Sequence, residues 1–445
     1  MCVAEELQKP ATEIYDLMKM PSTRKQNLIP VEEARKRVLD AISPLDTELV
    51  SLLDAIGRIC ARDQKSDIDI SPFDHSAMDG FALVSADIEQ ASLENPIELP
   101  VVAEIPAGDY YDDVVKPGTC VRIMTGAPVP AGADTVVKFE IVTNIENEGR
   151  TPGRVAFTAP SVVGANIREK GEEIHVGEVA IRAGEPISPA GAGLLASCGM
   201  AYVEVYRRPR VAVIPIGSEL VGPDAVPQKG EIRDGNSYAI GASVIRAGGI
   251  PVLQPIVPDD KDALTKAVLN ATKDCDFVVS SGGASTGDFD FIEEVVSENG
   301  ELLMDFVNMR PGKAQTFGFV QGTPVFGLSG NPAAAYCGFE MLVRPALRKM
   351  QGYSTFDRPH IWARLTHDAK KKDARRIYLR STLERKEDGS VQVRPAKSQS
   401  SGLFSPFQSG NCLAVLPEGV PESKKVEAGT LVECLLLDVD EGVVI

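Results

Sequence analysis

A glycine-rich loop followed by two carboxylates lies in the segment 276–290, which reads DFVVSSGGASTGDFD. The apolar run Phe277–Ser281 predicts a strand, and Asp288 and Asp290 open a predicted helix after the loop. A turn of this kind directs backbone N–H groups and the positive end of a helix dipole toward an anion. Carboxylates there would repel a phosphate unless a cation lies between them. The pattern therefore predicts a phosphate-bearing ligand held with a hard metal such as Mg²⁺.

The loop residues expected to contact that ligand are Gly282, Gly283, Ser285 and Gly287. An ordinary strand-to-helix turn, in which an aspartate only caps the helix, explains the same letters. The loop alone does not decide between these two interpretations.

Polar residues follow other predicted strands in the same part of the chain. Ser218 and Glu219 follow one strand in IGSEL, and Asp234 stands at a helix entrance in EIRDGNSY. Asp259 and Asp260 follow another strand in VPDD, where one of the two is expected to be only a helix cap. Each segment also has a plain structural explanation. Together, at consecutive strand ends, they predict one shared site.

Two more segments add cations and a helix terminus. The turn Arg310-Pro311-Gly312-Lys313 places two cations around a rigid Pro-Gly pair. A solvated turn is the usual meaning, but beside carboxylates and a phosphate loop a lysine is the expected partner for an oxyanion. In LSGNPAAA, Asn331 is the predicted N-cap of a helix and Pro332 its first residue. Gly330 comes directly before this N-cap. This terminus is a second predicted anion-binding position.

A sheet is needed to bring these segments together. The predicted strands are 211–216, 251–257, 277–281 and 324–328, and the predicted helices are 237–247, 261–272, 289–298 and 333–347. This alternation favours a mostly parallel sheet with helices on both faces. Such sheets bind ligands beyond the carboxyl ends of their strands.

The flanking parts of the chain have other patterns. We predict a helix over 29–42, a short helix or turn over 49–56, a helix over 188–198 and a strand over 202–206. In residues 66–177, short apolar runs between Pro and Gly indicate a β-rich domain. After Gly352 the pattern predicts a small β-barrel, with strands at 361–365, 377–383, 391–393, 413–416 and 431–437. The expected organisation is an N-terminal extension (1–26), connector and dimerisation segments (27–65 and 178–208, the first helix able to pack on the α/β domain), a β-rich domain (66–177), an α/β domain (209–357) and the barrel (358–445).

Composition excludes several classes of protein. The net charge of −17 and the lack of a basic stripe argue against a nucleic-acid binder; the longest basic cluster, Lys370–Lys372, is predicted to be a solvated loop. No apolar run approaches the ~18–20 residues of a membrane span, and the N-terminus lacks a secretory pattern. Eight scattered cysteines without a CxxC pair favour reduced thiols in a cytoplasm. The motif GxxxxGK[ST] of P-loop ATPases and the motif GxGxxG of dinucleotide-binding oxidoreductases do not occur in the sequence, which argues against both classes.

The order of several segments resembles the MoeA family, which includes the E domain of gephyrin and its plant counterpart. The resemblance runs from about residue 29 to the C-terminus and rests on SAMDGFAL, RIMTGAPVPAGADTVV, IREKGEEI, IGSEL, IRDGNS, SSGGASTGDFDF, RPGK and GLSGNPAAA. It implies a four-domain subunit that forms a homodimer, binds molybdopterin in the α/β domain, and uses molybdate and Mg²⁺. The family reaction converts adenylated molybdopterin and molybdate to molybdenum cofactor and AMP.

The resemblance also assigns residues. Catalytic roles fall on Asp79, Glu173, Glu219, Asp259, Asp288, Asp290 and Lys313, and metal ligation on Asp288, Asp290 and Glu219. Substrate contacts fall on Ser218, Asp234, the glycine loop, Arg310–Gly312, Gly330–Pro332, Thr125 and Gly126, with Arg380 and Ser405 holding molybdate. Arg310 replaces the family's usual first lysine, and Gly402 replaces a basic residue in the barrel segment. The choice of molybdate over tungstate therefore stays open.

Two other functions are compatible with the same residues. One is a non-catalytic molybdopterin-binding or scaffolding paralogue, in which the carboxylates would be dispensable. The other is a nucleotide-processing enzyme that uses the same glycine loop, which would turn over a nucleotide without a pterin.

Overall fold

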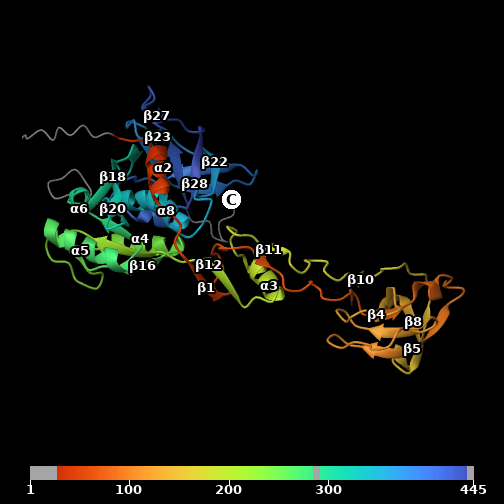
Figure 1. Ribbon diagram of the computed structural model, residues 1–445. Coiled ribbons are helices and arrows are strands. Elements are labelled where there is room, and N and C mark those ends of the chain that lie inside the picture. The colour runs from red at the N-terminus through yellow and green to blue at the C-terminus, as the bar shows by residue number, and fades with distance from the viewer. Residues whose placement is uncertain (1–27, 284–290, 438–445) are drawn as a thin grey trace, which may run out of the picture. The chain divides into compact units, whose positions relative to one another are not determined.

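The computed structural model describes residues 28–283 and 291–437, and these fall into two compact units (Figure 1). Of these described residues, one unit combines 28–44, 208–283, 291–351 and 355–437, and the other comprises 45–207 with 352–354. No helix within the described ranges is long and apolar enough to cross a membrane.

The α/β part of the first unit is built on a six-stranded sheet. Four strands are parallel, in the order β16 (Ile250–Leu253), β13 (Arg210–Pro215), β17 (Phe277–Ser281) and β21 (Thr323–Leu328). The sheet continues antiparallel through β20 (Ala314–Val320) and β18 (Gly300–Phe306). The sheet is therefore mixed, and its parallel part carries the predicted ligand loops. The antiparallel pair was not predicted from the sequence.

Helices cover both faces of this sheet, as predicted. On one face lie α4 (Asn236–Arg246), α7 (Pro332–Gly338) and α8 (Arg344–Met350), the last two joined by a π-helical turn, Phe339–Val343. On the other face lie α5 (Lys261–Asp274) and α6 (Ile292–Asn299). Aliphatic residues such as Val268, Val278 and Val295 form the core between this second layer and the sheet. Burial of this apolar surface is the main term holding the layers together.

The predicted first helix, α2 (Val31–Ala41), belongs to the same unit. Its buried residues Val31, Ala34 and Val38 follow helical spacing, and it packs on α8 and β18. The Lys349 ammonium donates to the Leu39 carbonyl at 2.6 Å near the end of α2. The helix is therefore an integral layer of this unit.

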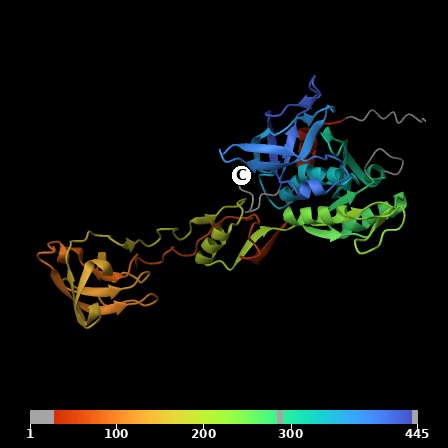
Figure 2. The same cartoon turned by 180° about the vertical axis from the view of Figure 1, so that it is seen from behind.

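The C-terminal part is a small β-barrel, as predicted. Its five strands, in barrel order, are β24 (Arg376–Arg385), β25 (Val391–Pro395), β22 (His360–Leu365), β28 (Leu431–Leu436) and β26 (Cys412–Leu416), which pairs back with β24 and closes the barrel. The short strand β19 (Met309–Arg310) extends from the α/β part and pairs with β24. Figure 2 shows the barrel, in blue, beside the green and cyan α/β part.

The second unit contains a strongly β-rich region, also as predicted. Its six-stranded sheet has the order β7 (Thr135–Lys138), β4 (Gly80–Leu83), β6 (Cys120–Ile123), β5 (Ile97–Ile105), β9 (Gly153–Phe157) and β8 (Val142–Glu146). The rest of the unit holds α3 (Pro189–Ser197), a strand pair formed by β1 (Thr47–Ser51) and β12 (Tyr202–Tyr206), and short bridged segments.

Two local predictions were wrong in part. Residues 49–56 were expected to form a short helix or turn, and residues 52–56 do form a turn. Residues 49–51 instead belong to the strand Thr47–Ser51, because its backbone pairs with Tyr202–Tyr206 far along the chain. The Lys370–Lys372 cluster was expected to be a solvated loop, but the Lys371 side chain is buried, with only 2% of the residue exposed.

Candidate functional site

The predicted strand-end segments converge at the carboxyl ends of the parallel strands. Gly282 N–H donates to the Leu328 carbonyl, and Asn236 donates to both the Ser281 hydroxyl and the Gly330 carbonyl at 2.7 and 2.8 Å. The ends of β17 and β21 are thus tied to the start of α4. This convergence is what parallel strands impose on loops that leave the same edge.

The glycines of the loop are required by the backbone. Gly282 has φ +99°, and a Cβ atom there would lie 2.2 Å from the Ile216 carbonyl oxygen. Gly283 also has a positive φ, +64°. A side chain at Gly282 would therefore displace the end of β13. The predicted residues Ser285, Gly287, Asp288 and Asp290 lie outside the described residues.

The acidic segments separate into caps and exposed carboxylates. Asp260 accepts from the Ala263 N–H at 2.7 Å and caps α5, so it is the aspartate of the VPDD pair that acts as a cap. Asp259 instead accepts from the Ser218 N–H at 2.8 Å, and the Ser218 hydroxyl accepts from the Asp259 N–H. Asp234 is buried and accepts from the Ser237 N–H at the start of α4. Glu219 is exposed beside this reciprocal pair.

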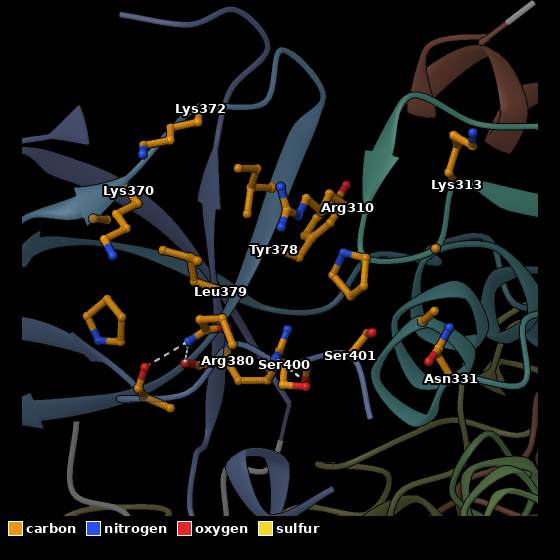
Figure 3. Close-up of a pocket in the computed structure, with 18 of the residues that line it drawn as sticks. Arg310, Lys313, Asn331, Lys370, Lys372, Tyr378, Leu379, Arg380, Ser400 and Ser401 are labelled. Atoms are coloured by element: carbon orange, nitrogen blue, oxygen red, sulfur yellow. Dashed lines mark hydrogen bonds between the residues drawn. The ribbon is translucent and has the colours of Figure 1, made fainter. Parts of the chain in front are cut away.

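A cavity of about 910 Å³ lies between the α/β part and the barrel of the first unit (Figure 3). The α/β side contributes Lys313 and Asn331, and the barrel side contributes Lys370, Lys372 and Arg380. Among the described residues, the cationic lining is Arg310, Lys313, Lys370, Lys372, Arg380 and Lys397, against one lining carboxylate, Asp368. In a chain of net charge −17, this concentration of cations marks a site for an anion.

Arg380 is the most unusual member of this lining. Its residue exposure is 2%, its Nη2 donates to the Ser400 carbonyl at 2.9 Å, and its guanidinium lies 5.7 Å from the Phe407 ring centroid. Among the described residues, its Nε has no hydrogen-bond partner. Burial lowers the pKa of Arg380 from its ordinary value, because the charged form loses hydration. An anion in the cavity would compensate this charge.

The Pro-Gly turn and the start of α7 form the opposite wall. Arg310, Pro311, Gly312 and Lys313 all line the cavity, with Arg310 held by Asp373 at 3.2 Å. Asn331 occupies the N-cap position of α7 but makes no side-chain capping bond, and Pro332 is the first helical residue. The Asn331 side chain, exposed and on the cavity wall, is therefore available to a ligand.

Serine residues on the cavity wall differ from the predicted one. Ser405 begins the short helix α9 (Ser405–Gln408) and is not part of the lining, whereas Ser400 and Ser401 are. The Ser401 carbonyl accepts from the Ala333 N–H at 2.8 Å, which fastens this barrel loop to the first turn of α7. Ser400 and Ser401 belong to the sequence SQSSG, in which no motif indicates that they, and not Ser405, would line a cavity.

The remaining predicted residues form a separate group in the second unit. Asp79 accepts from both the Thr125 N–H and the Thr125 hydroxyl at 2.7 Å. The Thr125 backbone N–H is the main reason that the pKa of Asp79 is below its usual value. Gly126 follows in the same turn with φ +82°, and Glu173 is exposed, its N–H donating to the Ile70 carbonyl. His175 lies 3.5 Å from Asp69, a carboxylate neighbour that the sequence did not indicate.

Comparisons with known proteins cover nearly the whole chain. Residues 29–199 match the MoeA N-terminal region (domain I and II), residues 212–349 a probable molybdopterin binding domain, and residues 362–437 the MoeA C-terminal region (domain IV). A molybdopterin molybdenumtransferase of Staphylococcus aureus (strain COL) is 36% identical over 94% of this chain and 97% of its own length. One from Bacillus subtilis (strain 168) is 34% identical over 94% and 96%.

A solved structure agrees with these matches. The molybdopterin biosynthesis moeA protein of Pyrococcus horikoshii superposes with a TM-score of 0.77 at 31% identity, covering 92% of this chain and 99% of that one. The likeness therefore extends over both units and the barrel.

Proposed function

Because the chain belongs to the MoeA family of molybdopterin molybdenumtransferases, enzymes of molybdenum cofactor biosynthesis, we propose that it inserts molybdate into adenylated molybdopterin and releases AMP. The cation-lined cavity with the unpartnered Arg380 Nε is the observation that carries this proposal. Molybdate and the phosphates of the pterin are both anions that such a cavity would attract.

Arg380 is proposed to hold molybdate. A buried guanidinium whose Nε–H has no partner within the described ranges presents a directed, charge-assisted donor to a tetrahedral oxyanion. Ser400 and Ser401 line the cavity in the same loop whose carbonyl accepts from Arg380, beside the proposed molybdate position. Lys313 and Asn331 are proposed to contact the phosphates of the pterin from the opposite wall.

In the proposed reaction water attacks the pterin-side phosphorus of the phosphoanhydride, and the P–O bond to AMP breaks, so that AMP leaves with that electron pair. The two thiol groups of the pterin replace one oxo group of molybdate, which leaves with their two protons as water. Negative charge grows on the departing AMP oxygen, so preorganised cations on the cavity wall lower the barrier by electrostatic stabilisation. Lys313 is proposed for this role because it belongs to the rigid Pro-Gly turn, and the Ser218–Asp259 pair is proposed to fix the neighbouring loop.

Magnesium is part of the proposal through Asp288, Asp290 and Glu219. Carboxylate oxygens are suitable donors for this hard cation, which would supply charge neutralisation at the phosphates. Within residues 28–283 and 291–437 no three His, Cys, Asp or Glu side chains are grouped as metal ligands. No step is therefore assigned to the metal here.

We further propose that the enzyme acts in the cytoplasm as a homodimer. Asp79, Thr125, Gly126 and Glu173 are proposed to take part in the reaction from the second unit. Size-exclusion chromatography with light scattering tests the dimer directly: a monomeric mass at micromolar concentration would contradict it.

The decisive experiment supplies purified protein with adenylated molybdopterin, molybdate and Mg²⁺ and measures AMP release. We expect molybdate-dependent release that is lost in an Asp288→Asn/Asp290→Asn variant and on chelation of the metal. Molybdate-independent release with a nucleotide lacking the pterin would instead indicate a nucleotide-processing enzyme. Pterin binding without any release, unaffected by the double substitution, would indicate a scaffolding paralogue. Tungstate in place of molybdate tests oxyanion preference.

A further inference from the structure

The basic run Lys370–Lys372 alternates between the cavity and the protein interior. Lys370 and Lys372 line the cavity (Figure 3). Lys371 between them is buried. Lys370 belongs to β23 (Ala369–Lys370), which pairs with β27 (Lys425–Val426), and the Lys371 N–H donates to the Lys424 carbonyl at 2.9 Å. Extended backbone sends successive side chains to opposite sides. The strand pairing therefore fixes which lysines face the cavity.

Lys371 acts as an internal anchor for this segment. Its ammonium donates to the Asp373 carbonyl at 2.7 Å and to the Arg375 carbonyl. Burial lowers the pKa of Lys371, so the position is costly for a cation unless these carbonyl bonds form. The bonds close the loop 371–375 on itself and hold the two flanking lysines in place.

A second connection joins the loop to the Pro-Gly turn. The Asp373 carboxylate accepts from Arg375 Nε at 2.9 Å and lies 3.2 Å from Arg310 Nη1. Arg375 is the main cause that holds the pKa of Asp373 well below its usual range. The loop is thus braced against β19 as well as β27.

Asp368, the carboxylate that the described part of the chain places on the cavity wall, is already neutralised from outside the cavity. Asp368 accepts from the Lys425 ammonium at 2.6 Å and from the Ala428 N–H at 2.9 Å. Among the described residues, no acid is paired with Lys370 or Lys372, although both are exposed to the cavity. Two like charges are therefore held on one wall without a compensating group, at a cost that an anion would remove.

We propose that Lys370 and Lys372 form a second anion-binding subsite, specific for a phosphate group and distinct from the oxyanion position at Arg380. The inference rests on the proposed function, since it divides the proposed substrate cavity into two positions. Lysine ammonium groups are compact, hydrated point charges suited to a phosphate that keeps part of its water, whereas the buried guanidinium suits a smaller, desolvated oxyanion. Lys371 is a positioning residue for this subsite.

Equilibrium binding without turnover tests the division. Full-length protein is titrated calorimetrically with inorganic phosphate, AMP, adenosine and molybdate at a fixed ionic strength. The test variant is Lys370→Ala/Lys372→Ala. The matched control, Lys266→Ala/Lys386→Ala, also removes two exposed lysines but leaves the cavity lining intact. A third variant, Lys371→Met, removes no charge from the lining.

We expect the test variant to weaken AMP or inorganic phosphate binding by about tenfold or more, because two charge-assisted contacts are lost. We expect molybdate affinity to change by less than about threefold, adenosine not to bind, and the control to match the wild type. If the wild type binds AMP but not inorganic phosphate, the subsite is assigned to the phosphate of a nucleotide. If it binds both AMP and inorganic phosphate, the subsite accepts phosphate groups in general. Lys371→Met should reproduce part of the loss; should it fail to fold, the double variant decides alone.

Three results would overturn the inference. One is unchanged phosphate and AMP affinity in the test variant. Another is an equal loss of molybdate and phosphate affinity, which would describe one undivided cavity. The third is no phosphate or AMP binding to the wild type at millimolar concentration. Loss of phosphate binding as expected, in a protein that releases no AMP from the adenylated pterin, would refute the proposed reaction and leave the subsite standing.

Discussion

Replacing Arg380 by methionine should weaken molybdate binding while leaving the protein about as stable as before. The substitution keeps an unbranched stem against the Phe407 ring and removes the charge and the free Nε–H. It also removes the 2.9 Å bond to the Ser400 carbonyl. A residue that serves packing alone would show the opposite pattern, with lost stability and unchanged affinity.

The magnitude follows from the contacts of Arg380. A hydrogen bond to a charged group contributes about 1.5–3 kcal/mol. At about 1.4 kcal/mol per factor of ten, its loss corresponds to about 10- to 150-fold weaker binding. In the unliganded protein the lost carbonyl bond costs about 1 kcal/mol. Relief from burying an incompletely paired guanidinium offsets this cost. The thermal unfolding midpoint should therefore move by no more than about 2–4 °C.

Calorimetric titration with molybdate at physiological ionic strength is the assay. Arg394→Met is the matched control, because Arg394 lies on the same barrel and is 58% exposed, in a surface ion pair with Glu384. Its removal should change affinity by less than about twofold, since exposed charges are screened. The reasoning is refuted if Arg380→Met binds molybdate as the wild type does, or if both arginine variants lose the same affinity.

Further predictions concern the loops and buried groups around the site. Gly282→Ala should lower the unfolding midpoint clearly more than Gly230→Ala, because both have positive φ but only the Gly282 Cβ meets a carbonyl, at 2.2 Å; equal losses would show that the close approach does not matter. Asp373→Asn should destabilise the protein at pH 7 by about 1–2 kcal/mol. Its folded pKa is lowered by Arg375, so this contribution is present above the unfolded pKa and is lost as pH falls through the folded one. Denaturant titrations between pH 6 and pH 2 should show the gap to wild type closing below the ordinary carboxyl pKa, and a gap that widens would contradict the cause assigned. Cys337, whose pKa burial raises to about 12, should resist alkylation in native protein at pH 8 and react after unfolding, as mass spectrometry can measure.

The sequence predicted the parallel core and the barrel because their signals are local. The runs at 277–281 and 202–206 end where their apolar or alternating pattern ends, and β17 and β12 have the same limits. The antiparallel pair β18 and β20 was not predicted, because the segment RPGK lies between the two strands and was interpreted only as part of the ligand site. The strand at Thr47–Ser51 was missed because LVSLLDAI also fits a helix, and only its distant partner Tyr202–Tyr206 decides.

The cavity itself was beyond the reach of sequence patterns. Lys313 and Asn331 were predicted from their neighbours along the chain, and both lie on its wall. Lys370 and Lys372 could not be distinguished from surface lysines, because their orientation depends on the carbonyls that hold Lys371 and on pairing with β27. Ser400 and Ser401 likewise reach the wall through a bond to the first turn of α7, which no spacing reveals.

Anomalous diffraction from crystals soaked with molybdate is the most direct measurement of the central claim, that oxyanion chemistry takes place in the cavity between the α/β part and the barrel. The account predicts a molybdenum peak within hydrogen-bond distance of Arg380 Nε, in the cavity shared with Lys313 and Asn331. A fully occupied peak elsewhere, with no molybdate oxygen bonded to Arg380 Nε, would contradict it.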